Sequence, residues 1–155
     1  MAIRSAAKAL IVRNGAALLI RCVNESGHVH YDLPGGGQHQ YETLEEAVVR
    51  ECLEETGYLV TVVRFAALAE EIYDDRALRE RYPDYTHRIH HIFLAEILGG
   101  APDEATETDF HQASCDWVPV DRMCELDIRP AQLGDALERV LFSDSPVYLG
   151  AVHVR

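Results

Sequence analysis

The sequence lacks any apolar run close to the roughly 20 residues that a helix needs to cross a bilayer, so we expect no membrane partner. Its first residues, 1–5, lack the charged and then long apolar regions of a signal peptide. Repeats, low-complexity tracts and linkers are also missing, which favours one domain over residues 1–155. We therefore expect a globular chain of the cytoplasm.

Cysteine is scarce and scattered. The chain has no C-x-x-C pair, and its four cysteines are Cys22, Cys52, Cys115 and Cys124. This distribution predicts free thiols in a reducing compartment and argues against both a disulfide framework and a cysteine metal site. The spacings of histidine and cysteine also match no common zinc pattern.

Basic residues are few: 14 lysines and arginines face 26 acids, for a formal charge of −12. Such a surface should not bind nucleic acid polymers. It would also repel an anionic nucleotide unless divalent cations inverted the local field. The acidity therefore favours a function that needs a metal.

The most informative segment is Gly36–Tyr58, which reads GGQHQYETLEEAVVRECLEETGY. Its fixed positions follow the pattern G-x5-E-x7-R-E-x-x-E-E-x-G. Thr43 and Glu46 form a capping box that predicts a helix from Leu44. Gly57 provides a left-handed C-terminal cap.

The helix has two distinct faces. The face expected to pack on a sheet contains Val48, Val49, Cys52 and Leu53. The neighbouring arc contains Glu51, Glu54 and Glu55. Like charges at these spacings repel each other, so a positive group is expected among them.

A carboxylate cluster of this kind suits Mg²⁺ or Mn²⁺, because hard cations prefer oxygen ligands. The glycines at 35–37 let backbone groups approach the same site. Arg50 lies eight residues after Glu42, and its planar fork suits a bidentate contact that braces the glycine loop against the helix.

The segment resembles the Nudix box of the Nudix hydrolases, with every fixed letter present. Cys52 and Tyr58 replace aliphatic residues, which affects packing and not chemistry. The resemblance implies an α/β fold, the α/β/α sandwich with a mixed β-sheet, and metal-dependent hydrolysis of a nucleoside diphosphate linked to another group. The residues it implies as metal ligands or base are Glu51, Glu54, Glu55 and the Gly35 carbonyl. We place Glu54, Glu51 and Arg50 in the catalytic site, braced by Glu42, Gly36 and Gly57.

Other segments predict the remaining elements. Asn14-Gly15 joins the apolar runs 6–12 and 16–23 as a hairpin. Further strands are expected at 59–68 (continuing weakly to 73), 89–97, 114–120 and 147–154. Asp121 could cap a short helix, and 130–142 reads as a C-terminal helix with Pro130 at or near its start. This helix and the Nudix-box helix should cover opposite faces of the sheet.

Two regions are candidates for substrate binding. The segment 74–91 is rich in arginine, histidine and tyrosine, and we select Arg88 for a phosphate and Tyr85 for a base. His90 and His91 must point to opposite sides of their strand, so at most one faces the site. In the acidic segment 104–112, we select Glu107 and Asp109. Each region could instead be a solvated loop.

The sequence thus indicates a hydrolase, with a nucleotide, a nucleotide sugar such as ADP-ribose, or a nucleoside triphosphate as substrate. Glu54 or an acid of 104–109 would act on the attacking water. The alternative is a nucleotide-sensing domain without catalysis. A homodimer also remains open.

Overall fold

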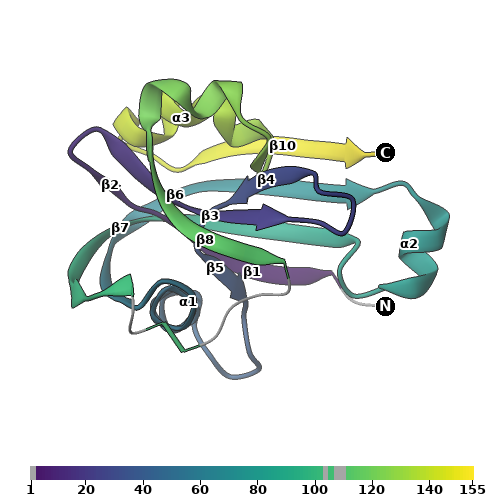
Figure 1. Cartoon of the computed structure of the whole chain (residues 1–155), viewed down its shortest axis with the longest axis horizontal. Coiled ribbons are helices and arrows are strands. Elements are labelled where there is room, and N and C mark those ends of the chain that lie inside the picture. Colours follow the sequence, from purple (N-terminus) through teal and green to yellow (C-terminus); the bar gives the residue numbers. More distant parts are fainter. Residues whose placement is uncertain (1–2, 103–104, 107–110) are drawn as a thin grey trace.

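The computed structural model describes residues 3–102, 105–106 and 111–155. Within these residues there are ten strands, three α-helices and the 3₁₀ helix η2. Figure 1 shows how they are arranged. The elements are β1 (Arg4–Leu10), β2 (Val12–Arg13), β3 (Ala16–Val23), β4 (Val29–Asp32), β5 (Gly35–Gly37), α1 (Leu44–Thr56), β6 (Tyr58–Tyr73), α2 (Arg76–Arg81), β7 (His87–Gly100), β8 (Gln112–Pro119), the 3₁₀ helix η2 (Val120–Glu125), β9 (Ile128–Arg129), α3 (Gln132–Phe142) and β10 (Val147–Val154).

The strands form two mixed sheets. The first has the order β10-β6-β7-β1-β5, with β1 and β7 parallel and β6 and β7 antiparallel. The second has the order β2-β3-β4-β9, and β8 pairs with β3. The predicted α/β class with mixed pairing is confirmed, and the strands divide between two sheets.

The first predicted hairpin is present, but only in part. Asn14 and Gly15 both have positive φ, 52° and 75°, and join β2 to β3. The apolar run before them, expected as one strand, divides at Ile11. Its first part, β1, lies in the first sheet, and β2 lies in the second. The run therefore links the two sheets.

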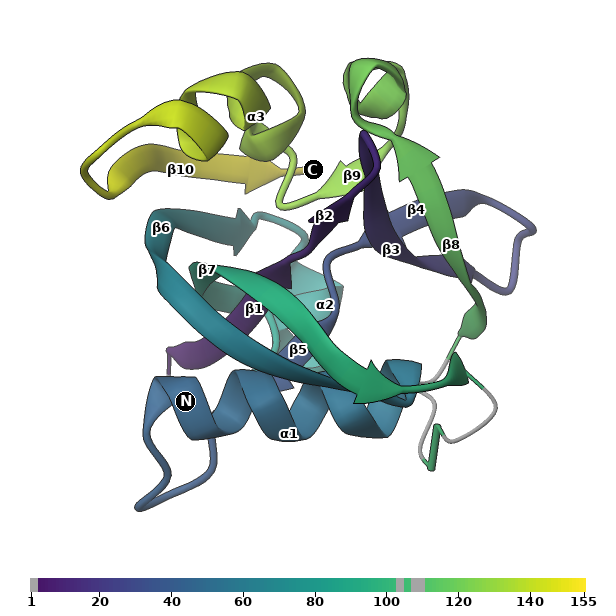
Figure 2. The same ribbon diagram turned by 90° about the vertical axis from the view of Figure 1, so that its left-hand side faces the viewer.

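Helices α1 and α3 cover opposite sides of the first sheet (Figure 2). Because side chains alternate along a strand, Ala7 and Ala9 of β1 pack with the α1 cluster and Leu10 packs with the α3 cluster. The layered arrangement predicted for the two helices is confirmed. No helix among the described residues is long and apolar enough to span a membrane.

Three local predictions need correction. Leu53 of α1 is 40% exposed, because the buried face of the helix turns toward Ala47 and Glu55 instead. Asp121 lies inside η2, whose first turn follows Pro119. Helix α3 begins at Gln132, two residues after Pro130.

Candidate functional site

The ends of α1 are fixed by local contacts that the sequence predicted. The Glu46 amide donates to Thr43 Oγ1 at 3.1 Å, and the Thr43 amide donates to Glu46 Oε2 at 2.8 Å. At the other end, Gly57 has φ 71° and donates to the Leu53 carbonyl. A Cβ on Gly57 would lie 1.9 Å from the Ala101 carbonyl oxygen, so this cap requires glycine. These contacts fix the residues at which α1 begins and ends.

Arg50 of α1 lies at the centre of a network of charged side chains. Its Nε and Nη2 donate to the two carboxylate oxygens of Glu42 at 2.8 and 2.9 Å, the bidentate contact expected. Nη2 also reaches the Gly37 carbonyl, at 3.1 Å. Nη1 donates to both Glu51 and Glu54, at 2.8 and 3.0 Å. The guanidinium is thus the positive group among the glutamates, and it ties them to the glycine loop.

The pairing of Arg50 with Glu42 shifts the pKa of both groups. The hydrogen bond from Arg50, helped by the His39 amide, lowers the pKa of Glu42 to about 2. The same pairing raises the pKa of Arg50 above its usual value. Both groups therefore stay charged at neutral pH.

The backbone amide and carbonyl of Gly35 are both held by side chains. Its amide donates to Glu55 Oε2 at 2.8 Å, and Glu55 is only 5% exposed. Its carbonyl accepts a short hydrogen bond from Lys8 Nζ, which also donates to the Leu33 carbonyl at 3.1 Å. Gly35 has φ 126°, and a Cβ there would lie 2.1 Å from the Ala7 carbonyl oxygen. Only glycine fits this close approach of β5 to β1, so the glycine segment expected as a loop is a short strand.

Glu51 lies against the next glycine. A Cβ on Gly36 would stand 2.5 Å from Glu51 Oε2, so the absence of a side chain admits the carboxylate. Glu51 and Glu55 therefore both meet the loop at Gly35 and Gly36, with Glu54 beside them through Arg50. These donors are all oxygen, the set that Mg²⁺ or Mn²⁺ takes, so the residues fit a hard divalent cation.

A cavity of about 920 Å³ opens beside this loop and includes Gly35 and Gly36 in its wall. Its wall contains five basic side chains: Arg4, Lys8, Arg81, Arg88 and Arg129. It also contains three tyrosines: Tyr73, Tyr82 and Tyr85. Five of the 14 basic residues of a chain with net charge −12 therefore line a cavity that borders the glycines contacted by the α1 glutamates.

Both residues selected from the 74–91 segment line the cavity, and the Arg88 Nε donates to the Tyr85 carbonyl at 2.8 Å. His90 lines it too, buried and 3.0 Å from Glu71. His91 points away, its Nδ1 3.2 Å from the Ala6 carbonyl. The expectation that the two histidines face opposite sides is confirmed. Glu107 and Asp109, with Glu104, lie outside the described residues.

Sequence reasoning missed several cavity residues. Arg4 and Lys8 share one face of β1, and Arg4 lies 4.4 Å from the centre of the Tyr85 ring. Arg129 donates to the Tyr73 hydroxyl at 3.2 Å. The alternation of Arg4, Ala6 and Lys8 was the available signal, but which face of the strand was open to solvent was unknown.

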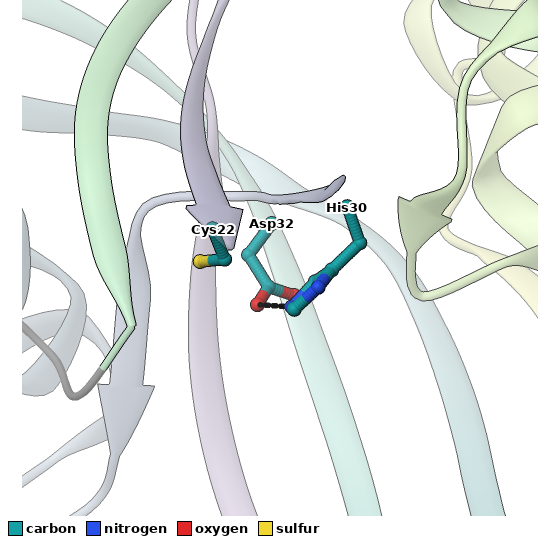
Figure 3. Close-up of side chains that lie close together, drawn as sticks. All are labelled: Cys22, His30 and Asp32. Atoms are coloured by element: carbon teal, nitrogen blue, oxygen red, sulfur yellow. Dashed lines mark ion pairs between the residues drawn. The ribbon is translucent and has the colours of Figure 1, made fainter. Parts of the chain in front are cut away.

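A second group of side chains runs against the sequence expectation that cysteine and histidine form no metal site. Cys22, His30 and Asp32 have donor atoms that all lie within 4.8 Å of one another (Figure 3). Within the described part of the chain, no other three His, Cys, Asp or Glu residues meet this closely. The glutamates of α1 are spread between Arg50 and the Gly35 amide.

Comparison with known proteins identifies the family. Residues 2–140 match the NUDIX domain family. "Putative mutator protein MutT4" of Mycobacterium tuberculosis is 33% identical over 142 residues, 86% of this chain and 52% of that protein. ADP-ribose pyrophosphatase of Methanocaldococcus jannaschii is 35% identical over 104 residues, 65% of this chain and 57% of that protein. The chain spans about half the length of these relatives.

The fold agrees as well. A solved NUDIX hydrolase from Nitrosomonas europaea superposes with a TM-score of 0.70 at 18% identity, over 88% of this chain and 87% of that one. The layered fold, with a glutamate helix behind a glycine loop, defines the class. This chain belongs to the NUDIX family.

Proposed function

We propose that this chain is a divalent-metal-dependent hydrolase that cleaves a phosphoanhydride in a nucleoside diphosphate linked to another group. One observation carries the proposal: Glu55 and Glu51 of α1 contact Gly35 and Gly36, and these two glycines line a cavity rich in arginine and tyrosine. An anionic nucleotide fits the basic cavity, and a metal at the acidic end offsets the repulsion between carboxylates and phosphates.

The residues proposed to hold Mg²⁺ or Mn²⁺ are Glu51, Glu54, Glu55 and the Gly35 carbonyl. When bound, the metal would polarise phosphate oxygens and neutralise developing charge. The Lys8 ammonium donates to the same carbonyl, so a metal ion bound there would share this oxygen with Lys8 or displace it. Lys8 also adds a positive charge next to the place where a phosphate would lie.

Glu54 is the proposed general base within the described residues. Its side chain is 29% exposed, more than the 16% of Glu51, so a water can reach it. Arg50 holds its carboxylate from one side, at 3.0 Å, and orients it. An acid of the 104–109 segment is the alternative base, as the sequence already left open.

The cavity would hold the remainder of the substrate. Arg88 and Arg4 would bind phosphate oxygens through charge-assisted hydrogen bonds, and Tyr85 would stack against a base or sugar. A volume of about 920 Å³ falls in the usual range of small-molecule pockets. Two relatives carry the names "ADP-ribose pyrophosphatase" and "Putative 8-oxo-dGTP diphosphatase", so nucleotide sugars and nucleoside triphosphates are the first substrates to try. We further propose that the protein acts in the cytoplasm. That it forms a homodimer remains a prediction.

The test is a panel of nucleotide sugars, dinucleotides and nucleoside triphosphates, each incubated with the chain and Mg²⁺ or Mn²⁺, with products separated and identified. We expect nucleoside monophosphate or pyrophosphate products that vanish with chelator and return with metal. Glu45→Gln serves as a matched control, because Glu45 is an exposed glutamate in the first turn of the same helix. Tight nucleotide binding without any product across the panel would favour the sensing domain instead.

A further inference from the structure

Cys22 and His30 are direct partners across two antiparallel strands. In the pairing of β3 with β4, Cys22 lies opposite His30, and Ile20 lies opposite Asp32. Directly opposed residues project to the same face, and so do residues two apart on one strand. The hairpin therefore places a thiol, an imidazole and a carboxylate on one face.

These side chains lie together in the wall of the cavity (Figure 3). Their donor atoms are all within 4.8 Å of one another, and His30 Nε2 is 3.6 Å from Asp32 Oδ2. Cys22 is 6% exposed, while the side chains of His30 and Asp32 keep 23% and 24% of their surface. The group is thus sheltered on the strand side and open on the cavity side.

We propose that Cys22, His30 and Asp32 form a binding site for one Zn²⁺ ion, separate from the carboxylates of α1. Sulfur, imidazole nitrogen and carboxylate oxygen are the three donor types that Zn²⁺ takes in proteins. Mg²⁺ is a poor fit because it avoids thiolate and imidazole. Three protein ligands leave a fourth position, as in zinc sites that also bind water or a substrate atom. That position would face the cavity.

Three positive groups oppose the ion: the His30 imidazolium, Lys8 and Arg88. The Asp32 carboxylate and the Cys22 side chain beside it raise the pKa of His30 to about 9, so a proton occupies the imidazole at neutral pH. The charges of Lys8 and Arg88 also act on Asp32. Lys8 is directed toward backbone carbonyls of the glycine loop, however, so it does not occupy the group itself. Binding Zn²⁺ releases the proton of the imidazolium and the proton of the thiol, after which imidazole and thiolate act as ligands.

The first test uses Co²⁺, which takes zinc ligand sets and gives a thiolate charge-transfer absorption in the near ultraviolet. The full chain, stripped of metal, is titrated with Co²⁺ in the presence of excess Mg²⁺, which occupies the carboxylate site. We expect a band that saturates at one ion per chain and disappears when Zn²⁺ is added. Cys22→Ser should abolish the band, whereas Cys124→Ser should keep it, because Cys124 is an exposed thiol outside the group.

The second test measures Zn²⁺ affinity by competition with a chromophoric chelator, and it does not depend on activity. Loss of a residue that only orients a ligand weakens metal binding about 10- to 100-fold, so His30→Gln and Asp32→Asn should each cost about 100-fold or more. Glu55→Gln should leave the zinc affinity unchanged, which separates this site from the proposed hydrolase site. Circular dichroism confirms that each variant is folded.

Absence of the Co²⁺ band in the parent chain would overturn the proposal, as would a band that persists in Cys22→Ser. Zinc affinity unchanged in both folded variants, His30→Gln and Asp32→Asn, would show that these two residues form only an ion pair. Failure of the zinc site leaves the metal-dependent hydrolase untouched, since the two use different residues.

Discussion

The acidic face of α1 and the basic wall of the cavity beside it are assembled in different ways. The three glutamates lie between positions 51 and 55 of one helix, and a single arginine, Arg50, links two of them to the loop. The cations of the cavity come from β1, α2, β7 and β9, as far apart in the chain as Arg4 and Arg129. The first region depends on helix periodicity, and the second depends on the tertiary fold.

The difference also divides the proposed chemistry. The α1 side offers oxygen donors for a metal and a carboxylate for the attacking water. The cavity side offers guanidinium groups and aromatic rings for holding the nucleotide. Variants on the α1 side should therefore lower turnover, and variants on the cavity side should raise KM.

The largest effect is expected from Glu55→Gln. The glutamine can still accept the Gly35 amide hydrogen bond, so the fold should persist, but a charged metal donor is lost. Even residues behind a metal ligand affect activity by about 10- to 100-fold, so we expect kcat to fall about 100-fold or more. Steady-state kinetics at saturating Mg²⁺ measures this, with Glu45→Gln as control. Turnover within about twofold of the parent would remove Glu55 from the metal site.

Arg88→Ala tests the cavity side. Hydrogen bonds to charged groups contribute about 1.5–3 kcal/mol, which corresponds to a rise in KM of about 10- to 100-fold with little change in kcat. Arg76→Ala is the matched control, because the Arg76 side chain is 92% exposed, pairs with Glu80 and is not among the residues that line the cavity. If both variants keep the parent KM for the best substrate of the panel, Arg88 does not hold a phosphate.

The contact of Arg50 with Glu42, which braces the glycine loop against α1, is tested by Arg50→Lys and Glu42→Gln. Lysine keeps the charge but loses the bidentate fork, so each variant should lower kcat by about tenfold through displacement of the glycine loop. The double variant should be little worse than either single one, since both remove one contact. Losses that multiply fully would mean that the two residues act separately.

The smallest effect concerns acid stability. In the unfolded chain Glu42 has a pKa of about 4.5, and folding lowers it to about 2. A lowered pKa stabilises the folded state above pH 4.5, and this contribution is lost as the pH falls toward 2. Glu42→Gln should therefore flatten the fall in melting temperature over this window. An unchanged slope, with Glu45→Gln behaving identically, would show that the pair with Arg50 does not favour the charged form.

Local features were predictable because they depend on residues close in the sequence. The capping box at Thr43, the glycine cap at Gly57 and the bidentate contact of Arg50 with Glu42 follow from spacings of three to eight residues. The last strand, Val147–Val154, also agrees with its expected bounds. The prediction that Leu53 packs on the sheet was wrong, because helix periodicity defines an apolar arc but not how the helix is rotated against its sheet.

The cavity could not be derived in this way. Arg4 and Arg88 are register partners across β1 and β7, a pairing that bridges more than half of the chain. Cys22 and His30 meet only because β3 and β4 align in one register, and a shift by one residue would separate them. The acids of the segment 104–112 lie outside the described residues, so their part in the site remains a prediction; they are Glu104, Glu107 and Asp109.

The most direct test of the proposed division is a pair of calorimetric titrations on the parent, Glu55→Gln and Arg88→Ala. One measures Mg²⁺ binding, and the other measures binding of a non-hydrolysable nucleoside diphosphate analogue at saturating Mg²⁺. We predict that Glu55→Gln loses Mg²⁺ affinity, while Arg88→Ala binds Mg²⁺ like the parent and loses affinity for the analogue. Parent-like Mg²⁺ binding by Glu55→Gln, or weakened Mg²⁺ binding by Arg88→Ala, would contradict the assignment of metal to α1 and nucleotide to the cavity.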